Sequence, residues 1–253
     1  MTGMLASVQT LDEAQFVLKH GADIIDLKAP ANGALGALPL DQVHRIVDAI
    51  GHALPVSATI GDLPMEPQIV HRAAMAMAAT RVDFVKIGFF PEGDKDATLA
   101  LLKNTAFLNT RLIAVLFADG DLDPSDIAKA SNAGFSGVML DTQDKNHGRL
   151  TDLLHQEQLK QFVNEAKCHQ LLCGLAGSLN IQDIADLLPL APDYLGFRGA
   201  LCKNHARKED IDPDAVNKVK NAIHTEYLSR RLSENREPTA EKPILARFPD
   251  HVR

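Results

Sequence analysis

Several charged side chains close short apolar segments, where they could take part in chemistry. In the segment ADIIDLK, residues 22–28, Asp26 and Lys28 follow two isoleucines. The other charged residues in such positions are Lys86, Asp141 and Arg198. Lysine is among the residues least often buried, so a lysine at the end of an apolar strand calls for an explanation.

Two lysines that the fold brings close together, here Lys28 and Lys86, would suggest imine chemistry. A free lysine is protonated at neutral pH and is then a poor nucleophile. Desolvation and a second cation both favour the neutral amine, which can attack an aldehyde or ketone. The protonated imine acidifies the adjacent C–H and permits aldol chemistry. We therefore predict that Lys28 is the nucleophile and that Lys86 or Asp141 moves protons.

The elements that position these residues alternate between strand-like and helical patterns. Strand-like segments are 4–9, 22–28, 55–60, 82–88, 111–117, 136–141, 171–176 and 193–198. Helical segments are 11–20, 39–52, 67–80, 94–105, 124–133, 155–170, 180–188 and about 212–230. Apolar strands alternating with helices indicate a parallel sheet covered by helices, and eight such units fit a single (β/α)8 TIM barrel. The rival is an open doubly wound sheet, which the absence of a GxGxxG after the first strand disfavours.

We predict one barrel over residues 1–230 and a C-terminal tail over residues 231–253. The tail is charged and rich in proline, which is typical of a mobile terminus. Its short apolar stretch PILARF could instead dock on the barrel or on a neighbouring subunit.

A barrel brings the polar strand ends to one face, where barrel enzymes place their active sites. Asp26 and Lys28 are two residues apart and so project to the same side of their strand. Lys86, Asp141 and Arg198 end other even-numbered strands, so all of these residues can share one layer. A single one of them could be a solvated side chain or the start of a turn. Their joint occurrence predicts a catalytic site.

Small residues after the last two strands suggest a phosphate site. The segment LAGSLN carries Gly177 and Ser178, and the segment GFRGALC carries Arg198 and Gly199. Exposed backbone N–H groups at this place in a barrel commonly hold a phosphate. The sequence therefore predicts a phosphorylated carbonyl substrate. Residues 29–37 and 147–149 are candidates for a second anion site.

Composition excludes several other classes of function. A net charge of −7 argues against a broad surface for nucleic acid or anionic membranes. Three cysteines without a CxxC, and no basic region followed by a long apolar stretch at the N-terminus, predict a soluble cytoplasmic protein. The histidines and cysteines lack zinc-ligand spacing, so we expect no metal site. We expect a small-molecule partner and a homo-oligomer, because compact barrels often associate.

The blocks GADIIDLKAPANGALGA, VSATIGDLP, DFVKIGFF, VMLDT, LAGSL and GFRGALCK resemble the (5-formylfuran-3-yl)methyl phosphate synthase family over roughly residues 4–225. The family belongs to methanofuran biosynthesis in methanogens and methylotrophic bacteria. The resemblance implies a TIM barrel that joins two glyceraldehyde 3-phosphate molecules, with loss of phosphate and water and without a metal or redox cofactor. It implies Lys28 as the Schiff-base lysine, Lys86 as the proton acceptor and Asp141 as the aspartate of the LDT motif. Lys145 would be the lysine that usually follows this aspartate a few residues later and contacts the substrate.

In this hypothesis one triose phosphate isomerises towards a dihydroxyacetone-phosphate-like species, and an imine or enamine at Lys28 adds to the aldehyde of the second. Two other functions stay open. A generic class I aldolase or a metal-free sugar-phosphate isomerase would use similar lysines without releasing phosphate. A non-catalytic phosphometabolite-binding protein would never be modified covalently at Lys28.

Overall fold

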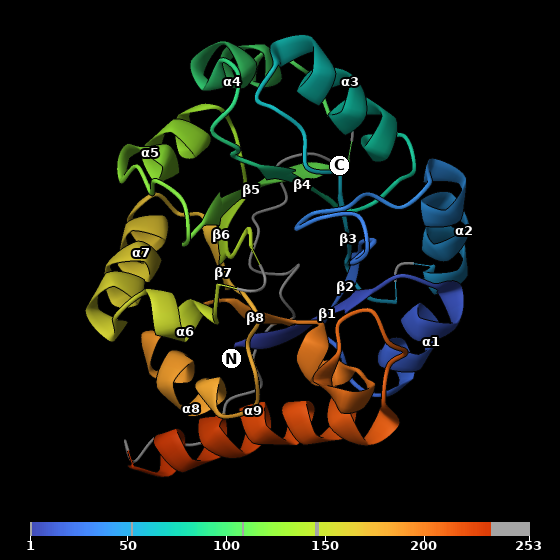
Figure 1. The fold of residues 1–253 in the computed structure, drawn as a ribbon, viewed down its shortest axis with the longest axis vertical. Coiled ribbons are helices and arrows are strands. Elements are labelled where there is room, and N and C mark those ends of the chain that lie inside the picture. The colour runs from blue at the N-terminus through green and yellow to red at the C-terminus, as the bar shows by residue number, and fades with distance from the viewer. Residues whose placement is uncertain (1, 52, 108, 145–146, 234–253) are drawn as a thin grey trace.

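Eight parallel strands form a closed barrel in sequence order, which confirms the predicted fold (Figure 1). The computed structural model describes residues 2–51, 53–107, 109–144 and 147–233. The strands are β1 Gly3–Val8, β2 Ile24–Leu27, β3 Val56–Thr59, β4 Phe84–Gly88, β5 Arg111–Phe117, β6 Gly137–Asp141, β7 Leu172–Leu175 and β8 Tyr194–Phe197. The barrel closes because β1 pairs with both β2 and β8.

Helices surround the barrel and follow the strands in sequence, as Figure 1 shows. They are α1 Leu11–Lys19, α2 Leu40–Ile50, α3 Pro67–Ala78, α4 Lys95–Lys103, α5 Ser125–Asn132, α6 Leu150–Leu153, α7 Gln156–Cys168, α8 Asp183–Leu187 and α9 Pro213–Ser233. Three short 3-10 helices are η1 Leu188–Leu190, η2 Gly199–Leu201 and η3 Lys203–His205. The sequence pattern did not predict α6 or these three short turns.

The last helix crosses the predicted boundary at residue 230, since α9 continues to Ser233. The rest of the predicted tail, residues 234–253, lies outside the described residues. The division into barrel and tail, and the role of the tail, therefore stay predictions.

Two apolar cores stabilise the barrel, because side chains along a strand alternate between its two faces. The larger core lies between the sheet and the helices and includes Ala6, Ile25 and Leu27. The smaller core fills the barrel interior and includes Leu5 and Ile24. Because Ile24 faces the interior, Asp26 two residues later faces it as well.

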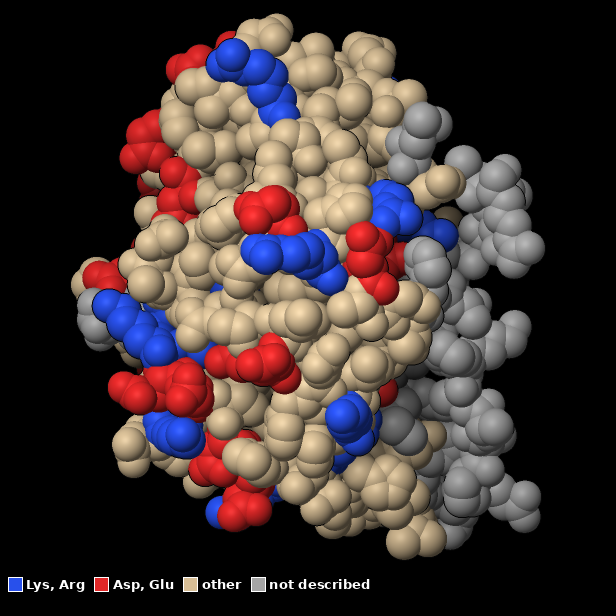
Figure 2. All heavy atoms as spheres, turned by 90° about the vertical axis from the view of Figure 1, so that its right-hand side faces the viewer, with Lys and Arg blue, Asp and Glu red and all other residues tan. Residues whose placement is uncertain are grey.

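The outer surface seen in Figure 2 carries positive and negative side chains that are interspersed rather than segregated. Several of the charged groups on the protein's helices form ion pairs, such as Arg45 with Asp41 one turn away on α2. None of the helices in the described part of the chain is both long and apolar enough to cross a membrane.

Candidate active site

A buried carboxylate, Asp26, is the centre of a polar network inside the barrel. Its Oδ1 accepts hydrogen bonds from Lys86 Nζ at 2.9 Å and from Ser57 Oγ at 2.7 Å. Its Oδ2 accepts a hydrogen bond from Ser7 Oγ at 2.9 Å. The sheet register dictates this arrangement, because Asp26 is paired with Ser7 on β1 and with Ser57 on β3.

The ion pair between Lys86 and Asp26 is almost completely removed from solvent, with side-chain exposures of 1% and 0%. Burial by itself raises the pKa of Asp26, but the charges of Lys86 and Lys28 and the hydrogen bonds from Ser57 and Lys86 more than offset it, and the pKa lies below the ordinary value. Asp26 is therefore a carboxylate at neutral pH, and it interacts electrostatically with both lysines.

Lys28 lies one level above this network and lines a cavity of about 810 Å³ at the C-terminal end of the strands. Asp141, which is 1% exposed, lines the same cavity. Lys86 lies deeper, beside a small void that also touches Ser57 and Tyr194. The expected single layer of catalytic residues is thus wrong in detail, since Lys86 stands below Lys28 and contacts Asp26.

The loop after Lys28 is held in one conformation by Asp62, which follows β3. The two carboxylate oxygens of Asp62 accept hydrogen bonds from the backbone N–H groups of Ala34 and Leu35, at 2.8 and 2.7 Å. Gly33 has φ +113°, and a Cβ at this position would overlap the Asp62 carboxylate. The loop at 29–37 is therefore folded against the barrel and fixes the chain immediately after Lys28.

The loops after β7 and β8 supply the small residues predicted for a phosphate. Gly177, Ser178 and Gly199 line the same cavity as Lys28. Among the hydrogen bonds of the described residues, none is donated by the backbone N–H groups of Gly177, Ser178, Gly199 or Ala200. Gly177 has φ +105°, and a Cβ there would lie 2.8 Å from Thr142 Cγ2, so this loop requires glycine to approach the end of β6.

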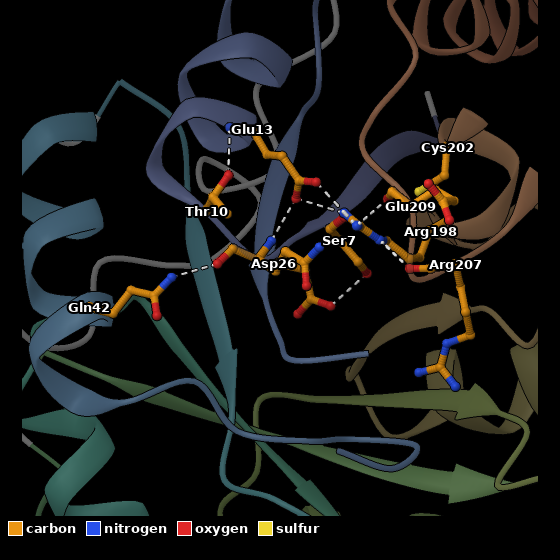
Figure 3. Close-up of polar contacts among 10 residues, drawn as sticks. Ser7, Thr10, Glu13, Asp26, Gln42, Arg198, Cys202, Arg207 and Glu209 are labelled. Atoms are coloured by element: carbon orange, nitrogen blue, oxygen red, sulfur yellow. Dashed lines mark hydrogen bonds and ion pairs between the residues drawn. The ribbon is translucent and has the colours of Figure 1, made fainter. Parts of the chain in front are cut away.

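Arg198 does not have the role that the sequence predicts. It lines the cavity, but its guanidinium makes an ion pair with Glu13 on α1, at 2.7 and 3.1 Å. The remaining donors reach the carbonyl oxygens of Ser7, Arg207 and Glu209, at 3.2, 2.9 and 2.9 Å (Figure 3). A guanidinium has five N–H groups, and all five are used. Arg198 therefore fixes the loop after β8 instead of offering donors to a phosphate.

Arg207 is a residue that the sequence reasoning missed. It is partly buried and lines the cavity, and its Nη2 donates a hydrogen bond to Gly33 O at 3.0 Å. Burial lowers its pKa, and the charge of Arg198 adds to this, while Asp141 and Asp62 oppose it. No sequence signal separates it from the arginines and lysines common in exposed loops. Ser7 was also missed, although a small polar residue inside an apolar strand was a usable sign.

Two other expected contributors are not found in the described site. Lys145 lies outside the described residues, so its role stays a prediction. Arg149, in the segment considered for a second anion, is paired with Asp152 at 2.7 Å and Asp183 at 2.9 Å. Within the described residues, no three His, Cys, Asp or Glu side chains are grouped as a metal ion would require.

The fold and this polar centre define a TIM-barrel protein with a site at the C-terminal end of its strands. Similar solved structures include phosphoribosyl anthranilate isomerase from Thermus thermophilus, with TM-score 0.61 and 14% identity over 91% of this chain and 100% of that one. Another is 3-hexulose-6-phosphate synthase from Salmonella typhimurium, with TM-score 0.62 and 16% identity over 89% and 100%. At such identities the likeness extends to the fold alone.

The family follows from sequence comparison. The model of the 4-HFC-P synthase family matches residues 4–220. Relatives named (5-formylfuran-3-yl)methyl phosphate synthase include one from Methanopyrus kandleri, 33% identical over 87% of this chain and 98% of the relative, and one from Methanocaldococcus jannaschii, 34% identical over 86% and 97%. A protein of Methylorubrum extorquens that carries the same name provisionally is 44% identical over 83% and 86%. The chain belongs to the 4-HFC-P synthase family of methanofuran biosynthesis and is an enzyme of that family.

Proposed function

We propose that this enzyme condenses two molecules of glyceraldehyde 3-phosphate into (5-formylfuran-3-yl)methyl phosphate, with release of phosphate and water, through an imine at Lys28. The observation that carries the proposal is the placement of Lys28 on the wall of a cavity directly above the buried Asp26–Lys86 pair. The neighbouring ammonium group of Lys86 disfavours a second positive charge at Lys28, whose neutral form is the nucleophile.

The carbon skeleton of the product limits the order of bond formation. The furan carries its formyl and phosphomethyl groups on a branched six-carbon frame. Addition of an enamine to the aldehyde of the second triose, as expected from the sequence, gives an unbranched chain. The branched frame arises when the phosphate-bearing carbon of an aldotriose joins the carbonyl carbon of a ketotriose phosphate.

An imine at Lys28 can perform both halves of this reaction. Loss of the proton next to the imine carbon forms an enamine, which expels phosphate from the neighbouring carbon. The resulting enol carbon then attacks the ketone of the second triose. This ketotriose phosphate forms by isomerisation of another glyceraldehyde 3-phosphate molecule. Ring closure through the free hydroxymethyl oxygen, loss of two water molecules and hydrolysis of the imine give the furan and restore Lys28. We assign the proton transfer at the substrate to Asp141, which lines the same cavity.

We assign Lys86 a supporting role in this chemistry, beneath Lys28. It is an ion-pair partner of Asp26 and does not line the large cavity, so we assign it to proton exchange with Asp26 rather than to contact with the first triose. The backbone N–H groups after β7 and β8 bind one substrate phosphate, with Gly177, Ser178 and Gly199 forming that part of the wall. Arg198 holds this wall in place through Glu13.

The test is borohydride trapping with glyceraldehyde 3-phosphate, followed by peptide mass mapping and a phosphate-release assay. The wild-type enzyme should carry a reduced adduct on Lys28 and release phosphate. Lys28→Ala should lose both while keeping its melting temperature, and Lys103→Ala, which removes an exposed lysine of α4, should keep both.

Each contrary result points to a different function. An adduct without phosphate release would indicate an aldolase or isomerase. Turnover near the wild-type rate in Lys28→Ala would refute the imine mechanism. If the wild type forms no adduct and shows no turnover, the result would indicate a non-catalytic phosphometabolite-binding protein.

A further inference from the structure

Arg207 lines the cavity, connects two of the loops around it and is not used by the mechanism above. It belongs to the loop between β8 and α9, and its guanidinium donates to the carbonyl oxygen of Gly33 in the loop after β2, at 3.0 Å. Figure 3 shows its side chain directed away from Arg198. Arg207 lines the same cavity as Lys28 and Asp141.

The guanidinium of Arg207 has hydrogen-bonding capacity to spare. It carries five N–H groups, and the hydrogen bonds of the described residues use one of them, the bond to Gly33 O. Arg198, on the same loop, uses all five of its own on protein acceptors. Of these two arginines, Arg207 is the one that can bind a ligand with a planar pair of donors, the geometry that suits phosphate oxygens.

Among the described residues Arg207 forms no direct ion pair, although carboxylates act on it electrostatically. Arginine remains a cation at neutral pH even in a partly buried position. The opposing charges are those of Asp141 and Asp62, the two oxygens of Asp62 each accept a backbone hydrogen bond, and Arg198 adds a like charge. A partly desolvated cation in such surroundings attracts an anion more strongly than a fully hydrated one.

Both ends of the Arg207 residue are held. Its backbone carbonyl oxygen accepts a hydrogen bond from Arg198 Nε at 2.9 Å, and Arg198 is itself anchored by Glu13. Its guanidinium is tied to Gly33, beside the two residues that Asp62 fixes. The side chain is therefore preorganised for a ligand, which reduces the entropic cost of binding.

We infer that Arg207 forms a second anion subsite, which binds a phosphate monoester in the same cavity as the backbone N–H groups of the β7 and β8 loops. The inference rests on the proposed function, in which two triose phosphates bring two phosphate groups into one cavity. The two subsites differ in chemistry, since one consists of backbone N–H groups and the other of a guanidinium. They also differ in place, because Arg207 is tied to the loop after β2.

The first experiment measures binding of inorganic phosphate alone, by phosphorus NMR titration of the wild type and two variants. Arg207→Gln keeps the length and polarity of the side chain but removes its charge. Lys208→Gln is the matched control, because it removes the neighbouring, exposed cation of the same loop. We expect the wild type to titrate with two sites and Arg207→Gln to lose or weaken one of them by at least about tenfold.

Lys208→Gln should bind as the wild type does, and all three proteins should melt at similar temperatures. Arg207→Lys should recover part of the lost affinity, since it restores the charge but not the paired donors. Phosphate binding by Arg207→Gln within about twofold of the Lys208→Gln value would overturn the inference.

The second experiment measures turnover of glyceraldehyde 3-phosphate. Arg207→Gln should raise KM by about tenfold or more, while the Lys28 adduct still forms when the substrate is saturating. An unchanged KM would overturn the subsite. If the wild type forms no furan product but Arg207→Gln still loses a phosphate site, the proposed function fails and the anion subsite stands.

Discussion

Replacing Asp26 with Asn should strongly destabilise the protein, because it leaves the ammonium group of Lys86 in the barrel interior without its counter-charge. The pair is 0% and 1% exposed, and Nζ lies 2.9 Å from Oδ1. Removing one partner of such a buried pair typically costs about 3–5 kcal/mol. For a chain of this size the melting temperature should fall by roughly 6–20 °C.

A double-mutant cycle separates the ion pair from the other contacts of Asp26. Asp26→Asn, Lys86→Met and the double variant are unfolded in urea and their free energies of unfolding compared. The double variant should be less destabilised than the sum of the single variants, because it leaves no unpaired charge. Asp41→Asn is the control, since it breaks an exposed pair whose side chains are 71% and 76% exposed, and it should change stability very little. A loss below about 1 kcal/mol for Asp26→Asn, as an exposed pair gives, would refute the reasoning.

The same pair gives a pH dependence with a definite sign. Burial raises the pKa of Asp26, but Lys86, Lys28 and the Ser57 hydrogen bond bring it below the ordinary value of 3.8. A carboxyl group whose pKa is lowered by folding stabilises the native state above its unfolded pKa, and this contribution disappears as the pH falls through the folded pKa. The Asp26 contribution should therefore be constant near neutrality and be lost below about pH 4. Asp26→Asn should lack this part of the acid dependence in urea unfolding.

Two further outcomes test the site loop and the thiols. Gly177→Ala should lower the free energy of unfolding by about 1–3 kcal/mol, because its φ is +105° and a Cβ would press on Thr142. Gly134→Ala should cost less, since φ there is also positive, at +83°, but no atom lies within 4 Å; equal losses would show that backbone strain alone matters. In the native enzyme at pH 8, a thiol reagent should modify exposed Cys168 rapidly and leave the two buried thiols, because burial raises the pKa of Cys202 to about 11. Rapid modification of all three would contradict the buried geometry.

The sequence by itself determined the barrel and the polar residues at the C-terminal end of its strands. Strand and helix periodicities differ, and in a parallel barrel all strands end on the same face, so the order of elements places Lys28 and Asp141 together. The spacing of Ile24 and Asp26 likewise fixed the face of β2 on which the carboxylate lies. These features depend on local pattern and on the topology of one fold.

Only the tertiary structure decided which polar groups are available to a ligand. Arg198 and Arg207 are nine residues apart, and the sequence favoured Arg198 because it ends a predicted strand. The donors of Arg198 are taken up by Glu13, which is 185 residues away along the chain, and by backbone carbonyls, whereas Arg207 donates a single hydrogen bond, to Gly33 O. The depth of Lys86 below Lys28 was also decided by pairing across strands, which brings Lys86 Nζ to Asp26 Oδ1. Long side chains reach well beyond their own strand, so their partners depend on packing between distant segments and not on local spacing.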